Sequence, residues 1–241
     1  MENYKKIDNL LLKLIGLIFF IFPLGQLTKL PLFIEGVNIY VHDILIVILD
    51  ILLIYDFLKR NFKYKTNFLI KLALCFTLIA LFSWLVNLKR WGFSNSVFGL
   101  MYWLRWTAYI GIYFAVKKII STHKNFGKEK LNRLLIAAGF LTALGGIIQY
   151  LCCPDLRFLR FFNWDDHYYR LIGTFFDPAF IGVIITLTIL LILTEIKQKN
   201  FFCYLMLAIL FVALLLTYSR SSYLAFLIGI ALFATFKKRI Y

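Results

Sequence analysis

Few residues in this sequence are suited to metal binding or disulfide formation. The four cysteines are Cys75, Cys152, Cys153 and Cys203, and their spacing matches no metal-binding motif. Cys75 and Cys203 lie inside apolar runs, which favours small buried side chains, and the adjacent Cys152 and Cys153 seldom close a relaxed disulfide. We therefore expect no metal site, no redox role for the cysteines and no cofactor.

Acidic residues are also scarce, since 12 Asp and Glu stand against 27 Lys and Arg. No basic motif of the kind that binds nucleic acid accompanies this excess, and a protein with several membrane spans gains the same excess from cationic cytoplasmic loops. No soluble domain or low-complexity linker divides the chain, and no small-residue cleavage site follows the first apolar segment. We therefore expect no nucleic-acid partner and an uncleaved first span.

Hydrophobic residues make up 62% of the chain, more than a soluble core of 241 residues can bury. The sequence predicts an integral membrane protein in contact with the lipid bilayer. We expect one all-α domain, a polytopic transmembrane helical bundle of about eight spans. The spans are predicted at residues 10–27, 39–58, 68–88, 98–116, 131–151, 178–194, 201–218 and 222–236, with an outer interfacial loop at residues 152–177.

The orientation of the spans follows from the distribution of lysine and arginine. These residues concentrate in alternate loops, which predicts an even number of spans with both termini cytoplasmic. The cations of the opposite loops are mostly arginine, among them Arg157, Arg160, Arg170 and Arg220. Arginine carries a planar fork of donors that matches phosphate and carboxylate, so this face is expected to bind an anion. Alternatively, these arginines only contact lipid headgroups.

The apolar run from Phe201 to Phe236 is interrupted only at TYSRSS. As one helix at ~1.5 Å per residue it would reach roughly 54 Å, beyond the ~30 Å hydrocarbon core, so we expect it to fold back there. Arg220 then marks a membrane face. With Ser219 and Ser221 at the amino terminus of the last helix, it is predicted to form a phosphate site, the alternative being a capped turn whose arginine reaches water.

Two carboxylates and one arginine are predicted to lie inside the bilayer. Asp43 and Asp50 are seven residues apart on one face of the second span, and Arg105 lies in the fourth. An unpaired arginine at this depth is costly, so Arg105 is expected to pair with Asp43 or Asp50. A ligand-facing role for Arg105 is the alternative.

The outer loop contains the one weak candidate for a catalytic residue. His167, beside Asp165 and Asp166, is suited to act as a base, although a lone interfacial histidine is more typically a solvated side chain. Asp177 precedes Pro178 at the start of a predicted helix. We expect Asp177 to cap that helix rather than to take part in catalysis.

Two motifs together resemble the O-antigen ligase and polymerase family of bacterial envelope glycosyltransferases. The first is RLIGTFFDP, from Arg170 to Pro178, and the second is TYSRS, from Thr217 to Ser221. Further residues that fit the family pattern are Asp43, Arg105, Trp106 and Gln149.

The resemblance implies a metal-independent glycosyltransferase in the bacterial plasma membrane. Its donor would be a polyprenyl-diphosphate-linked glycan, and its acceptor a sugar hydroxyl on a glycan or lipid. Arg220 and Arg170 would bind the leaving diphosphate. Family members are longer, so the chain is expected to correspond to the amino-terminal part of one. Two other functions fit the sequence, namely a transporter or flippase for an anionic lipid or solute, and a noncatalytic membrane scaffold subunit.

Overall fold

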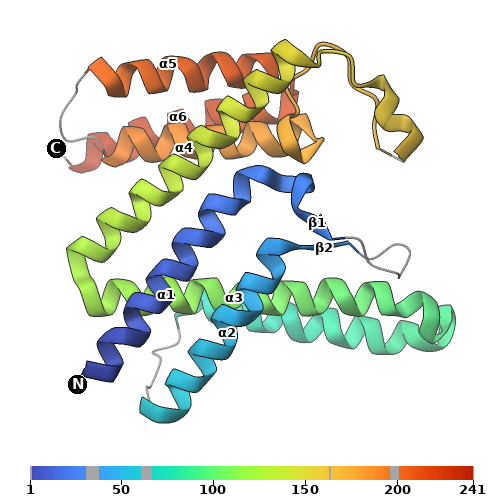
Figure 1. The fold of residues 1–241 in the computed structure, drawn as a ribbon, viewed down its shortest axis with the longest axis vertical. Helices are drawn as coiled ribbons and strands as arrows, with labels where there is room; N and C mark the ends of the chain where they lie inside the picture. The colour runs from blue at the N-terminus through green and yellow to red at the C-terminus, as the bar shows by residue number, and fades with distance from the viewer. Residues whose placement is uncertain (1, 31–37, 61–66, 163, 196–200, 241) are drawn as a thin grey trace. The chain divides into compact units, whose positions relative to one another are not determined.

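The protein is described by a computed structural model covering residues 2–30, 38–60, 67–162, 164–195 and 201–240 (Figure 1). Within these ranges the helices are α1 Glu2–Ile21, α2 Val41–Arg60, α3 Phe68–Cys152, α4 Pro178–Glu195, α5 Phe201–Leu216 and α6 Arg220–Ile240. Shorter elements are the 3-10 helices η1 Phe22–Thr28, η2 Arg157–Phe162 and η3 Gly173–Phe175, and the antiparallel strand pair β1 Lys29–Leu30 and β2 Ile39–Tyr40. The prediction of an all-α fold is confirmed.

Four helical stretches in the described ranges are long and apolar enough to cross a membrane. They are Ile7–Thr28, Phe68–Gly92, Gly127–Cys152 and Pro178–Glu195, and the shorter apolar helices Phe201–Leu216 and Arg220–Phe236 follow them. A helix satisfies its own backbone hydrogen bonds, which is the requirement for a segment surrounded by lipid. These stretches support a membrane protein.

The chain divides into two compact units. Unit 1 comprises residues 1–18 and 28–128, and unit 2 comprises residues 19–27 and 129–241.

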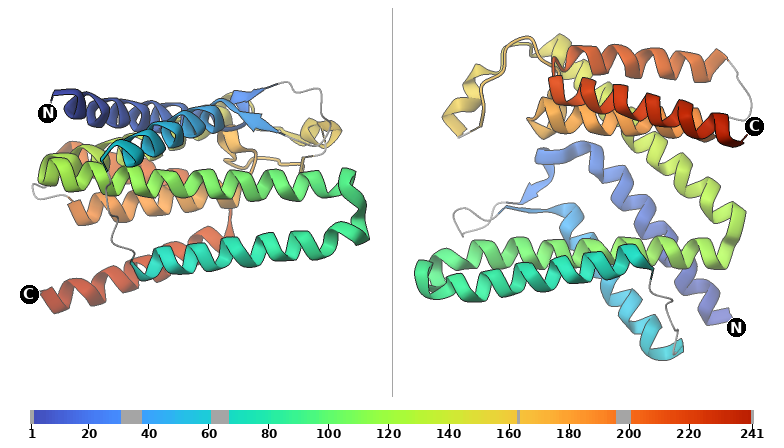
Figure 2. Two further views of the ribbon diagram at one scale, coloured as in Figure 1. Left: turned by 90° about the horizontal axis from the view of Figure 1, so that it is seen from below. Right: turned by 180° about the vertical axis from the view of Figure 1, so that it is seen from behind.

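In unit 1, helix α3 does not run straight. Gly92 has a φ of +71°, a left-handed conformation that glycine adopts without strain. Beyond it the chain runs back beside residues 68–92 (Figure 2). We call residues 68–92 and the antiparallel segment that follows them, which contains Trp103 and Lys118, the two arms of α3. Two indole N–H groups join these arms. Trp103 Nε1 donates to Thr77 O at 2.9 Å, and Trp106 Nε1 donates to Thr77 Oγ1 at 3.0 Å.

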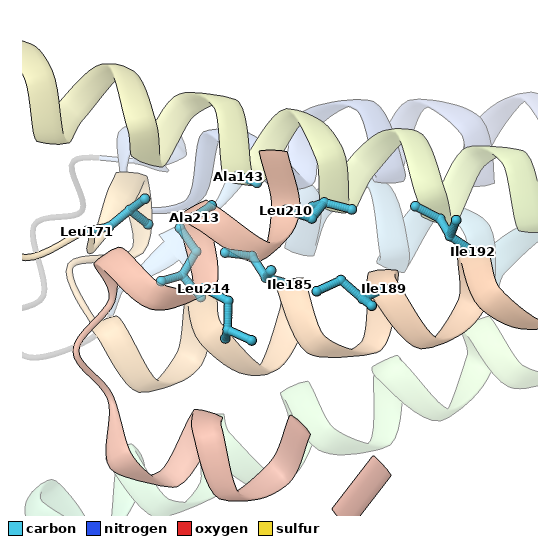
Figure 3. Close-up of a cluster of buried hydrophobic side chains, with 9 residues drawn as sticks. Ala143, Leu171, Ile185, Ile189, Ile192, Leu210, Ala213 and Leu214 are labelled. Carbon is cyan, nitrogen blue, oxygen red and sulfur yellow. The ribbon is translucent and has the colours of Figure 1, made fainter. Parts of the chain in front are cut away.

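Unit 2 is built around α4. The buried residues Ile181, Ile185, Ile189 and Ile192 follow spacings of four, four and three, which place them on one helical face. They pack against Leu210, Ala213 and Leu214 of α5, Ala143 of α3, and Leu171 (Figure 3). Between lipid-embedded helices such packing stabilises through van der Waals contact, because leaving lipid gains no hydrophobic free energy.

The segment between α3 and α4 forms a small cluster of its own. Leu156, Leu159 and Ile172 are buried together. On the exposed side Arg157 Nη2 donates to Asp155 Oδ2 at 2.6 Å. This hydrogen bond holds the pKa of the Asp155 carboxyl below its usual range.

Candidate functional site

The two motifs of the sequence analysis meet in unit 2. Arg170, in the first motif, donates from Nε to Thr217 O at 3.3 Å and from Nη2 to Tyr218 O at 2.8 Å. The next residue, Leu171, donates its backbone N–H to Leu216 O at 2.9 Å. The segment that precedes α4 is therefore attached directly to the turn between α5 and α6.

Arg170 completes the capping of α5. A helix ends with carbonyl groups that have no partner inside the helix, and a positive charge there is favourable. Leu214 O accepts from the backbone N–H and the hydroxyl of Thr217, at 3.2 and 2.7 Å. Leu215 O accepts from Tyr218 N at 3.2 Å and from the Tyr223 hydroxyl at 2.5 Å. Leu171 N and the Arg170 guanidinium supply the donors for the carbonyls of residues 216, 217 and 218. Every carbonyl from residue 214 to residue 218 therefore has a donor.

Gln149, near the end of α3, holds the first motif from the other side. Its Oε1 accepts from Ile172 N and Gly173 N, each at 3.0 Å, and its Nε2 donates to Cys153 O at 3.0 Å. Gly173 has a φ of +55°, and a Cβ at this position would lie 2.7 Å from Ile181 Cδ1. Glycine is therefore favoured at position 173, where a larger residue would adopt a left-handed backbone and displace the end of the Ile181 side chain.

The reversal predicted at TYSRSS is present, since α5 ends at Leu216 and α6 begins at Arg220. Ser219 caps α6, because its Oγ accepts from Ser222 N at 3.4 Å, and its Oγ also lies 2.9 Å from Ser222 Oγ. The hydroxyls of Ser219 and Ser221 lie 3.0 Å apart. Arg220 is exposed, and its guanidinium has no hydrogen-bond partner in the described part of the chain. The backbone N–H groups of Arg220 and Ser221 also have no partner among the described residues.

Helices α4 and α6 begin next to each other. The Ser222 hydroxyl donates to Ala179 O at 3.2 Å, and Gly182 allows the approach because a Cβ there would lie 2.2 Å from Ser222 Oγ. Asp177 Oδ1 accepts from Ala179 N at 2.7 Å and Phe180 N at 3.0 Å, so Asp177 caps α4. The amino end of α4 thus carries its own carboxylate, whereas that of α6 has a neutral cap and the exposed Arg220.

His167 is buried rather than solvated. Its side chain is 7% exposed, and neither ring nitrogen has a hydrogen-bond partner among the residues with described positions. Its backbone carbonyl accepts from Leu156 N at 2.9 Å, which fixes this part of the loop. The neighbouring Asp165 and Asp166 are exposed. The solvated reading is therefore wrong, and a catalytic role for His167 stays a prediction.

In unit 1, Arg105 pairs with Asp43 and not with Asp50. Arg105 Nη2 donates to Asp43 Oδ2 at 2.9 Å and also to Asn38 O. Asp43 further accepts from Tyr40 N at 3.0 Å and from the Tyr109 hydroxyl at 2.9 Å. The carboxylate of Asp43 thus has a donor on each oxygen. Whether Arg105 also binds a ligand stays a prediction.

A second buried ion cluster in unit 1 was not foreseen. Lys118 is 1% exposed, and its Nζ lies 3.2 Å from Asp8 Oδ1 and also contacts Asp56 Oδ2. Lys118 follows the predicted span 98–116, where the lysine and arginine distribution predicts a cytoplasmic loop. Nothing local marks its partners, because Asp8 lies in α1 and Asp56 in α2.

The described residues include no group of three or more His, Cys, Asp or Glu side chains placed to hold a metal ion. Comparisons of the chain with protein-family models, with curated proteins and with solved structures gave no match. The functional argument therefore depends on the geometry of the two joined motifs.

Proposed function

We propose that the chain is an O-antigen ligase-like membrane glycosyltransferase, or the amino-terminal part of one. It would handle a polyprenyl-diphosphate-linked glycan and transfer it to a sugar hydroxyl of a glycan or lipid acceptor. One observation carries the proposal. Arg170 of the first motif binds carbonyls of the TYSR turn 47 and 48 residues away, and Leu171 binds Leu216 O just before that turn. The contact brings residues of both motifs to one place in unit 2.

In this proposal the two arginines have different tasks. Arg170 is engaged by two backbone carbonyls, so it positions the turn. Arg220 has no partner among the described residues and therefore retains its fork of donors for the diphosphate. The hydroxyls of Ser219 and Ser221 and the free N–H groups at the start of α6 add donors beside it. Together they stabilise the negative charge that develops on the diphosphate as its bond to the sugar breaks.

The proposal includes a topology. We place about eight spans in a bacterial plasma membrane, with both termini cytoplasmic and the joined motifs on the outer side. The lysine and arginine distribution supports this orientation. The start of α4, the start of α6 and the end of α5 share one end of unit 2, which is compatible with a site at one membrane face.

The test is binding of a polyprenyl diphosphate to the purified chain in detergent. Arg220→Ala should weaken binding about ten- to over a hundredfold, since a charge-assisted hydrogen bond contributes roughly 1.5 to 3 kcal/mol. Arg220→Lys should weaken it less, because lysine keeps the charge but lacks the two-pronged geometry.

Arg160→Ala is the matched control, because Arg160 is an exposed arginine of the same unit outside the joined motifs. Its affinity should equal that of the unaltered protein. Thermal unfolding checks that each variant is folded. Unchanged affinity in a folded Arg220→Ala variant would reduce Arg220 to an interface anchor and remove the main support for the proposal.

A transporter is the second candidate function. From the sequence its cargo was expected to be an anionic lipid or solute, whereas the Asp50 carboxylate suits a cation. The observation in its favour is Asp50, a carboxylate within a predicted span that has no partner in the described part of unit 1. Ionisable groups inside spans commonly mark a binding or translocation path.

A further inference from the structure

Helix α2 carries three carboxylates along its length, and two of them have cationic partners. Asp43 pairs with Arg105, and Asp56 pairs with Lys118. Both cations come from the same arm of α3. The middle carboxylate, Asp50, faces Gly111 of that arm, between the two ion pairs in sequence.

Asp50 packs closely against Gly111 but has no hydrogen-bonding or ion-pair partner among the described residues. Its Oδ1 is buried, and neither oxygen has a hydrogen bond or ion pair with a described residue. A Cβ on Gly111 would lie 1.7 Å from Asp50 Oδ1, so any other residue at position 111 would displace the carboxylate. The fold therefore makes room for Asp50, but no described residue supplies a group to neutralise it. Withdrawing part of a carboxylate from water without a partner is unfavourable, and a cationic ligand would remove that cost.

A cavity of about 560 Å³ adjoins Asp50 within unit 1. Its walls are mainly apolar and are formed by Leu53, Ile54, Phe57, Leu74 and Phe114, among others. Among the described residues that line it, Asp50 is the one ionisable side chain. The cavity thus combines an apolar volume large enough for a small molecule with a single negative charge.

The lining excludes a bare inorganic cation as the natural occupant. Hard cations such as Ca²⁺ require six to eight oxygen ligands. Besides Asp50, the polar side chains of the lining are Thr77 and Thr107. Both donate their hydroxyl protons to carbonyls of their own helix, and Thr77 Oγ1 also accepts from Trp106. Too few oxygens remain to replace the hydration shell of an ion.

We propose that this cavity binds an organic cation with an apolar body, whose charge pairs with Asp50. The apolar part of the ligand fills the space between α2 and the two arms of α3, and the carboxylate takes the position of counter-ion. Phe57 and Phe114 supply aromatic surface for the same cation. This site lies in unit 1 and is independent of the proposed diphosphate site in unit 2.

The experiment measures equilibrium binding of tetraphenylphosphonium to the full chain in a neutral detergent. Tetraphenylborate, an anion of the same shape, is the matched control ligand. The protein should bind the cation at least tenfold more tightly than the anion. Asp50→Asn keeps the shape but removes the charge, and it should weaken binding of the cation tenfold or more.

Asp155→Asn is the matched control variant, since Asp155 is an exposed carboxylate of unit 2 whose loss should leave binding unchanged. Thermal unfolding reports whether Asp50→Asn is folded. Equal affinity for the cation in a folded Asp50→Asn variant would overturn the proposal. So would equal binding of the two ligands by the unaltered protein, a result that does not depend on any variant folding.

Discussion

The ion pair between Arg105 and Asp43 offers a sharp test of the arrangement in unit 1. Replacing Arg105 with leucine leaves the Asp43 carboxylate with two neutral donors, Tyr40 N and the Tyr109 hydroxyl. Replacing Asp43 leaves the Arg105 guanidinium with the Asn38 carbonyl. The side chains of Arg105 and Asp43 are 30% and 14% exposed, so each stranded charge is largely removed from water.

We expect each single replacement to lower the free energy of unfolding by about 2 to 4 kcal/mol, towards the lower side of the cost of breaking a buried pair. The double variant Arg105→Leu with Asp43→Leu should be no less stable than the worse single variant. The coupling energy of the double-mutant cycle should then be at least about 2 kcal/mol. The measurement is unfolding in mixed micelles with increasing denaturing detergent, followed by circular dichroism.

Asp50 provides the internal control for this cycle. It shares no hydrogen bond or ion pair with Arg105 in the described structure, so the cycle of Arg105→Leu with Asp50→Leu should be additive within about 0.5 kcal/mol. A coupling energy near zero for Arg105 with Asp43, or an equal coupling with Asp50, would refute the assignment of the pair.

Two further predictions concern unit 2 and the topology. Arg170→Gln should lower the free energy of unfolding by about 1.5 to 3 kcal/mol, because it removes the charged donor to two carbonyls after the end of α5. A folded variant of unchanged stability would contradict the positioning role. Reporter fusions after Tyr241 and within residues 157–170 should report cytoplasmic and external locations respectively, and an external signal at Tyr241 would refute the proposed orientation.

Features that follow from the bilayer were predictable from the sequence. The length of the apolar run from Phe201 to Phe236 required a reversal, and its polar interruption located the turn between Leu216 and Arg220. The cap at Asp177 was equally local, because Asp followed by Pro is a typical helix start. These predictions needed only distances along the chain.

Features that depend on facing helices were not predictable in the same way. Helical phase placed Asp43 and Asp50 on one face, so the sequence left both as partners of Arg105. In the structure Arg105 pairs with Asp43. The Tyr109 hydroxyl also donates to Asp43, whereas Asp50 lies opposite Gly111, which has no side-chain donor. No signal in one sequence specifies which residues of α3 lie opposite α2.

The contacts of Arg170 were not predictable for the same reason. Its side chain donates to carbonyls 47 and 48 residues away, and its predicted role in substrate binding stays a prediction. His167 was expected to be solvated, whereas it is buried within the segment between α3 and α4, whose packing no periodic pattern reveals.

The central claim, that the joined motifs bind the diphosphate of a polyprenyl-linked glycan, is tested most directly by locating the ligand. A polyprenyl diphosphate carrying a photoreactive diazirine next to the diphosphate would be crosslinked to the purified chain, and the adducts mapped by mass spectrometry. The account predicts adducts concentrated in residues 170–182 and 217–223, displaced by unlabelled polyprenyl diphosphate and strongly reduced in Arg220→Ala. Adducts confined to other helices, or a pattern that Arg220→Ala leaves unchanged, would contradict it.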